Sequence, residues 1–321
     1  MENSNKSVNV QRKSPNETKG KSGKFRGNQV SRLSEFFIHL VVGGFAFLCI
    51  LPFIFIIIIS FTSGYSLRTV GYSFFPIELS LDSYRAAFTM GDVLWRSYLV
   101  SFFVTIVGTF FSMVLTVLYS YGLFRKDYPL RKVFAFLVFF TMIFGGGLAP
   151  TVVVIRNLLN LGDTIWALII PSLMVPFHVI IMRTFFTTSI PDTLIECASL
   201  DGSGEFRTLL TIVVPLAKPG IATVSLLTAI GYWNDWWLAL LFLRDRSLFP
   251  LQYVLMEFQQ NIAFVRANLD RIGSANVDFA TLPSEGLQMA LAVLIVFPIA
   301  CAYPFFQRYI ISGLTVGAIK G

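Results

Sequence analysis

Six long apolar stretches alternate with more polar segments along the 321-residue chain. Each stretch has about the 20 residues that a helix needs to cross a bilayer. Such a segment must be helical, because a lone strand in lipid would leave its backbone groups unpaired. The pattern predicts an all-α integral membrane protein with six transmembrane helices, 36–61, 98–123, 133–154, 165–185, 221–243 and 286–306.

Two of these stretches contain residues that interrupt helices. Three glycines at 145–147 and Pro150 lie in the third stretch, and Pro171 and Pro176 lie in the fourth. In a membrane, such residues persist where neighbouring helices or a cavity satisfy the freed backbone groups. They fit a broken helix beside a pathway and, equally, close helix packing, which glycine permits.

The distribution of Lys and Arg predicts the orientation. With the N-terminus inside, 17 of the 25 basic residues fall in or beside inside segments and 8 fall outside. Because inside segments are rich in Lys and Arg, both termini are expected in the cytoplasm. The chain is expected to have three parts: a disordered basic tail at 1–35, a six-helix transmembrane domain at 36–306 and a cytoplasmic tail at 307–321. Within the transmembrane domain, the segments 124–132 and 186–220 are expected on the inside, and the second of them contains the cytoplasmic loop at 189–219.

The composition excludes several kinds of partner. Hydrophobic residues make up 55% of the chain and charged residues 13%, so the bilayer must be part of the solvent. Much of the net charge of +7 lies in the tail, so no nucleic acid is expected. The three Cys and two His lack ligand-like spacing, so no metal is expected. The run 15–22 nearly fits a phosphate-binding loop, but Pro15 replaces its first Gly and no strand precedes it.

The loop between the fourth and fifth stretches is the most informative segment. Ser189 and Asp192 have the spacing of a capping box, which predicts a helix that starts at Ile190. A turn signal follows at 201–204, and a second helical stretch follows it, which Pro215 closes. The residues alone predict a helix–turn–helix at the membrane surface. They do not separate an ordinary surface helix from one that enters a groove on another protein.

The spacing in this loop resembles the signature of ABC importer permeases. That signature reads Glu-Ala-Ala, three residues, Gly, nine residues, Ile, any residue, Leu-Pro. All gaps match, with Cys197 in place of an Ala and Val214 in place of the Leu. Further elements resemble the carbohydrate branch, related to the maltose permease, and its subgroup named for polysaccharide-linked lipoproteins. These elements are 145–151, 165–168, 233–236 and 307–321.

The resemblance implies a permease subunit of a binding-protein-dependent sugar or oligosaccharide importer in the bacterial cell membrane, where it forms half of the pathway. Its implied partners are a second permease of a different chain, two ATPase subunits, an extracellular solute-binding protein and membrane lipid. ATP and Mg would bind to the ATPase, so this chain would hold no cofactor and would not be an enzyme. The residues expected to dock on the ATPase are Glu196, Cys197, Ala198, Asp201, Gly202, Ile212 and Pro215.

An aromatic and polar cluster in the fifth stretch is the candidate pathway segment. Sugars bind aromatic faces and hydrogen-bonding groups, and a carboxylate inside an apolar span is costly unless it faces water or a partner. A structural contact between helices, or an aromatic belt at the membrane surface, would give the same pattern. The candidates are Tyr232, Trp233, Asn234, Asp235 and Trp236.

Three alternatives stand beside this interpretation. A secondary transporter or channel working alone would need no docking loop. An intramembrane enzyme would need a catalytic motif, and the spans contain no His-Glu-x-x-His motif, no serine motif with a paired His and no pair of carboxylates. Within the importers, the solute could be other than a sugar.

Overall fold

The computed structural model describes residues 32–268 and 285–318. Regular structure in this part is helical, with one isolated antiparallel bridge between Thr62 and Leu79. The chain divides into two compact units, Met1–Leu51 and Pro52–Gly321. The run 15–22 and most of the basic tail lie outside the described residues, so the expectations for them stay predictions.

Three single helices in the described ranges are long and apolar enough to cross a membrane. They are Leu33–Ser60 within α1 (Arg32–Ser60), α4 (Asp92–Phe124), and Glu285–Gln307 within α16 (Glu285–Ala318). Three more spans arise only if helices are joined across bends of 114°, 50° and 83°. The joined pairs are Arg131–Ile143 with Leu148–Leu158, Trp166–Ser172 with Pro176–Ser189, and Glu205–Leu216 with Lys218–Trp233. The expected all-α membrane protein is confirmed, with three to six candidate spans.

The third predicted span is a broken helix. Helix α5 (Arg131–Ile143) ends before the glycines, and the helical segment that begins with α6 (Leu148–Val153) continues after a bend of 114°. A Cβ built on Gly145 or Gly146 would meet nothing within 4 Å. Gly147 has a φ of +80°, in the region that favours glycine. These observations favour the broken helix over close packing as the reason for the glycines.

The fifth predicted span is also interrupted. Helix α12 (Lys218–Trp233) ends at the polar pair Asn234 and Asp235, and α13 (Trp237–Phe242) follows. The Oδ1 atom of Asp235 accepts the backbone N–H of Leu238 at 3.1 Å. Short polar side chains that bond to the backbone compete with helical hydrogen bonds, which explains the break. The prediction of one continuous helix here was wrong.

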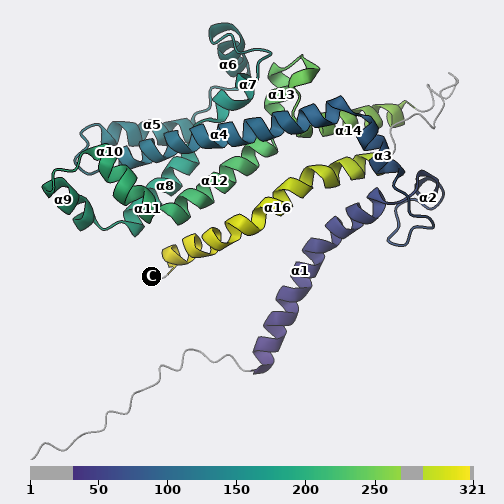
Figure 1. The fold of residues 1–321 in the computed structure, drawn as a ribbon, viewed down its shortest axis with the longest axis horizontal. Helices are drawn as coiled ribbons and strands as arrows, with labels where there is room; N and C mark the ends of the chain where they lie inside the picture. Colours follow the sequence, from purple (N-terminus) through teal and green to yellow (C-terminus); the bar gives the residue numbers. More distant parts are fainter. Residues whose placement is uncertain (1–31, 269–284, 319–321) are drawn as a thin grey trace, which may run out of the picture. The chain divides into compact units, whose positions relative to one another are not determined.

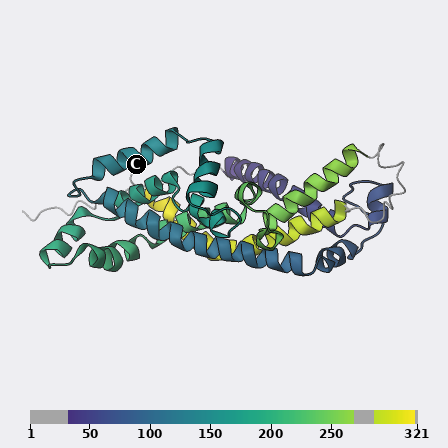
Figure 2. The same ribbon diagram turned by 90° about the horizontal axis from the view of Figure 1, so that it is seen from above.

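Helices α4, α8 (Pro176–Ser189), α12 and α16 pack along one another in the second unit (Figures 1 and 2). Two glycines lie at close approaches between them. A Cβ on Gly108 of α4 would lie 2.7 Å from Cζ of Tyr232 on α12, and one on Gly220 of α12 would lie 2.6 Å from Cγ of Phe185 on α8. Since glycine lets backbones approach closely, these positions fix which helix faces meet.

The two ends of this bundle carry different segments. Helices α9 (Asp192–Leu200) and α10 (Glu205–Thr208) lie at one end, and α3 (Asp82–Thr89) and α14 (Leu251–Ala267) lie at the other (Figure 1). An ion pair between Lys126 and Asp192 places the loop after α4 beside α9. Two of the segments predicted to lie on the inner side of the membrane, 124–132 and 186–220, therefore lie side by side.

Several helical segments were not predicted, among them α2 (Gly64–Thr69) and α3 in the outer segment 62–97. Helix α14 occupies part of the outer segment 244–285, and α16 runs to Ala318, beyond the predicted start of the C-terminal tail at 307. The helix continues through Pro298 and Pro304. The span at its start agrees with the predicted 286–306 to within one residue at each end.

Candidate docking surface and pathway segment

Helix α9 starts at Asp192 rather than at Ile190. Ser189 forms the last residue of α8, and its buried hydroxyl has no hydrogen-bond partner among the described residues. The N-cap is Pro191, which makes no side-chain cap hydrogen bond. The predicted capping box was wrong because the preceding helix extends through the serine. Asp192 instead lies in the first turn, where the helix dipole favours a negative charge.

A left-handed glycine ends α9. Gly202 has a φ of +72°, which a residue with a Cβ rarely adopts. The N–H of Gly202 bonds to the carbonyl of Ser199 at 3.1 Å, and the N–H of Ser203 bonds to the carbonyl of Ala198 at 2.9 Å. This Schellman arrangement satisfies the last carbonyls of α9 and turns the chain into α10. The predicted turn is confirmed.

The docking candidates on α9 fall on two faces. Ala198 is 6% exposed and packs inward with Ile195, which is 8% exposed. Ala198 therefore faces the interior of this chain, and the opposite face of α9 is exposed. The candidates on that exposed face and in its turn are Glu196, Cys197, Asp201 and Gly202.

The second helix of the loop contains a π-helical segment. Helix α10 leads into the π segment Leu209–Val213, and α11 (Val214–Leu216) follows. Pro215 therefore lies inside the helix, which corrects the prediction that it closes the helix. Proline has no N–H for the carbonyl four residues earlier, and the wider π turn accommodates that loss. Among the docking candidates here, Ile212 is half-buried and Pro215 is exposed.

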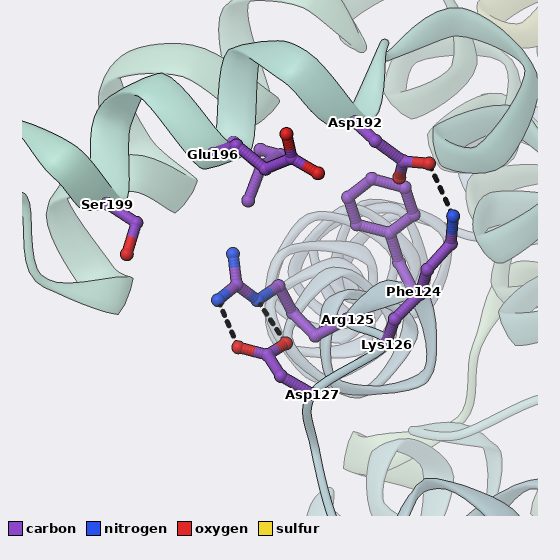
Figure 3. A pocket seen from close by; sticks show the side chains of 8 residues that line it. Phe124, Arg125, Lys126, Asp127, Asp192, Glu196 and Ser199 are labelled. Carbon is purple, nitrogen blue, oxygen red and sulfur yellow. Dashed lines mark hydrogen bonds and ion pairs between the residues drawn. The ribbon is translucent and has the colours of Figure 1, made fainter.

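A groove of about 270 Å³ lies between α9 and the end of α4. Charged side chains from both elements lie around it (Figure 3). Lys126 pairs with Asp192 across it. Its lining residues are Phe124, Arg125, Lys126, Asp127, Asp192, Ile195, Glu196 and Ser199.

Arg125, whose side chain is 13% exposed, connects two carboxylates. Its Nε donates to Oδ1 of Asp127 at 3.0 Å, and its Nη2 lies 2.5 Å from Oδ2 of Asp127 and 2.9 Å from Oε1 of Glu205. The hydrogen bond from the guanidinium lowers the pKa of Asp127 below its ordinary value. The hydroxyl of Tyr121 donates to Oε2 of Glu205 at 2.6 Å. Exposed ion pairs contribute only about 0–1 kcal/mol, so these contacts fix geometry more than they stabilise the fold.

Two of the pathway candidates lie in the interior of the bundle. Tyr232 and Trp233 are each 5% exposed. The hydroxyl of Tyr232 donates to the carbonyl of Ile169 at 3.0 Å, and Nε1 of Trp233 donates to the carbonyl of Ile295 at 3.2 Å. Both side chains connect α12 to neighbouring segments, which is the structural alternative raised by the sequence.

The other three candidates lie at the break between α12 and α13. The Oδ1 atom of the exposed Asn234 accepts from Nε2 of Gln252 at 3.0 Å. Asp235 is half-buried, and Trp236 is 37% exposed. The cavity beside Asp235 holds about 10 Å³, which is too small for a sugar ring in this conformation. The role of these residues in a pathway stays a prediction.

Asp163 is a structural residue that the sequence analysis did not find. Its Oδ1 accepts the backbone N–H groups of Arg244 at 2.8 Å and Asp245 at 2.9 Å. These bonds join two loops that are about 80 residues apart in the chain, and they lower the pKa of the carboxyl. The residue has a φ of +58°, a conformation in which Asp is enriched. No sequence motif marks this contact.

The family of binding-protein-dependent transport system inner membrane components matches residues 83–316. The chain belongs to this family. It is 37% identical to the polygalacturonan/rhamnogalacturonan transport system permease protein YtcP of Bacillus subtilis over 291 residues, which cover 91% of this chain and 99% of YtcP. It is 36% identical to Protein LplC of the same organism over 282 residues, covering 88% and 93%.

A solved structure shares the fold of this permease. It is a chain of a bacterial ABC transporter involved in the import of the acidic polysaccharide alginate. The identity is 28% and the TM-score 0.73, over 88% of this chain and 99% of that one. The match confirms the fold of an ABC importer permease.

Family membership decides several expectations. The chain is a multi-pass inner-membrane permease subunit of a binding-protein-dependent importer, and it is not itself an enzyme. ATPase and binding-protein partners follow from the family, and ATP belongs to the ATPase. A transporter that works alone does not fit this family.

Proposed function

We propose that this permease carries oligosaccharides derived from acidic polysaccharides, and that α9 couples it to the ATPase. The observation that carries the coupling assignment is the exposed face of α9, which presents Glu196 and ends in the left-handed Gly202 turn with the signature spacing. The turn is held by backbone hydrogen bonds, so the face is preorganised for a cleft on a partner.

The proposed assembly contains this permease, a second permease of a different chain, two ATPase subunits and an extracellular solute-binding protein. The permease crosses the membrane six times, with both termini, the α9–α11 loop and the tail from 307 in the cytoplasm. Support comes from the basic residues of the inside segments and from the contact between the loop after α4 and α9 at one end of the bundle.

The substrate class rests on the relatives. One is named for polygalacturonan and rhamnogalacturonan, and the solved relative takes part in import of an acidic polysaccharide. Both names describe polymers that contain uronic acids. The proposed substrates are therefore short oligosaccharides with uronic acid units.

The test is copurification through a tag on this chain alone, after expression with its candidate permease partner and ATPase. The ATPase should accompany the wild type and be lost or uncoupled with Glu196→Lys, which reverses a charge on the exposed face of α9. The same loss is expected with Gly202→Val, because a β-branched residue is strained at this φ.

The matched control is Asp82→Lys, the same charge reversal on an exposed carboxylate of α3 at the other end of the bundle. It should leave copurification unchanged. If stable wild-type protein brings down no ATPase, or if both loop variants bind and transport normally, the coupling assignment is wrong. Uptake of galacturonic acid oligosaccharides, with neutral maltose as the comparison, tests the substrate class separately.

A further inference from the structure

We infer that Glu205 is a positioning residue that locks the docking loop to α4, so that α9–α11 and the inner end of α4 move as one body. The inference rests on the proposed function, since it assumes that the ATPase moves α9. Glu205 is outside the docking positions of the signature, and neither the sequence nor the relatives assigned it a role.

One carboxylate contacts Tyr121 in the last turns of α4 and Arg125, the residue that caps this helix. Its Oε2 accepts the hydroxyl of Tyr121 at 2.6 Å, and its Oε1 lies 2.9 Å from Nη2 of Arg125. The backbone N–H of Arg125 bonds to the carbonyl of Tyr121 at 3.0 Å, so the two contacts lie about one helical turn apart. Two contacts at different heights resist rotation of α10 against α4, which a single contact would allow.

The guanidinium is itself held in place. Two hydrogen bonds from Arg125 to Asp127 fix the plane of its side chain, and this plane directs Nη2 toward Glu205. A separate ion pair, Lys126 with Asp192, attaches the first turn of α9 to the same loop. Both helices of the docking loop are therefore attached by charged contacts to the end of α4.

Apolar contacts hold the same elements together but do not set their register. Ile195 of α9 and Leu209 of the π segment belong to one buried cluster with Tyr121 and Phe124 of α4 and Phe186 of α8. Such contacts are non-directional, so they tolerate small shifts between helices. The hydrogen bonds to Glu205 are directional and supply the missing constraint.

If the docking loop is fixed to α4, a movement of the loop also moves the membrane-spanning part of α4. Helix α4 packs along α8 and α12, and the ring of Tyr232 on α12 packs directly against Gly108 of α4. A displacement of α9 by the ATPase would then move α4, and α4 would move α12, with no flexible segment between them. The lock adds little stability, because Glu205 and Asp127 are 60% and 67% exposed and solvent screens their charges. A variant without the lock should therefore fold and bind the ATPase but transmit its motion poorly.

The test uses the full complex with Tyr121→Phe and Glu205→Gln, which remove one hydroxyl and one charge at nearly constant volume. The matched control is Tyr119→Phe. The hydroxyl of Tyr119 lies on the same helix and donates to the carbonyl of Phe134 at 3.0 Å, away from the docking loop. All variants should copurify with the ATPase and have unchanged expression.

Two readouts follow. Spin labels on Thr211→Cys and Leu115→Cys, with the native cysteines replaced, report the distance between the docking loop and α4. This distance should stay narrow and unchanged by ATP in the wild type and Tyr119→Phe, and should broaden or shift with ATP in the two lock variants. Uptake of galacturonic acid oligosaccharides per ATP hydrolysed should fall about five-fold or more in the lock variants.

The outcomes distinguish failure of the lock from failure of the proposed function. A distance that shifts with ATP in the wild type, or lock variants with wild-type distances and wild-type uptake per ATP, would overturn the inference. Absence of the ATPase from the wild-type complex would instead remove the proposed docking function. If galacturonic acid oligosaccharides are not taken up, the spin-label distances alone decide for or against the lock.

Discussion

Gly202 and Gly204 flank the turn between α9 and α10 but have different backbone conformations. Gly202 has a φ of +72°, whereas Gly204 has a φ of −69° and is the N-cap of α10. A Cβ would meet nothing within 4 Å at either position. Substitutions at these two residues should therefore differ in their effect on stability only through the backbone conformation that each position requires.

We predict that Gly202→Ser destabilises the loop by about 1–2 kcal/mol, the cost of left-handed backbone for an L-residue. Gly204→Ser should be neutral or slightly stabilising, because serine is a favoured N-cap. Thermal unfolding of the purified complex and retention of the ATPase are the measurements. Equal effects of the two substitutions would contradict the role given to the turn.

Asp163 allows a prediction about pH. Hydrogen bonds from two backbone N–H groups lower its pKa from the ordinary 3.8, so its stabilising effect is present above that value and is lost as pH falls through the lower, folded pKa. Asp163→Asn keeps an oxygen acceptor but does not titrate. Between neutral pH and about pH 3, the unfolding temperature of the variant should fall less than that of the wild type. An identical fall in both proteins would show that Asp163 does not contribute.

At the scale of helices, Gly108 decides how α4 meets α12. We predict that Gly108→Ala displaces the ring of Tyr232 and costs about 1–3 kcal/mol, the usual cost of overpacking. Gly122→Ala is the control on the same helix, because a Cβ there meets nothing within 4 Å and alanine favours helices. Unfolding temperatures in detergent should separate the two variants, and a stable Gly108→Ala protein would contradict the packing.

Hydropathy found the three single-helix spans of the described residues, because these apolar stretches are long and lipid favours helices. It missed the break at Asn234 and Asp235, since the break depends on the bond from the backbone of Leu238 to the carboxylate. It missed α14, whose mixed polarity gives no membrane signal. The capping box failed because spacing does not reveal that Ser189 completes the preceding helix.

The proposed docking face could be found from the sequence only in part. The spacing of Glu196 and Gly202 follows the signature, but the inward orientation of Ala198 appears only once α9 is packed. The contacts of Glu205 join residues 84 positions apart, and no periodic pattern encodes such a pair. Long-range polar contacts of this kind depend on the tertiary fold.

For the whole molecule, the orientation in the membrane makes a sharp prediction. In a background of Cys49→Ser and Cys301→Ser, the exposed Cys197 should react with an impermeant maleimide in inside-out vesicles and not in intact cells. Added ATPase should protect it. Thr89→Cys, in a background that also carries Cys197→Ala, should react only in intact cells. Reaction of Cys197 in intact cells would show that the orientation in the membrane is the opposite of the one proposed.

The break between α5 and α6 has a consequence for how cells make this permease. The 13 residues of α5 extend about 20 Å, less than the roughly 30 Å of hydrocarbon. The non-helical backbone at 144–147 is exposed in this chain, and at membrane depth such backbone must be covered by protein or by a water-filled cavity. In the proposed assembly the second permease would supply this cover, so a copy made without it should be recognised as incomplete and degraded by membrane quality-control proteases. Surplus chains would be removed in this way, and assembly rather than matched synthesis would set the subunit ratio.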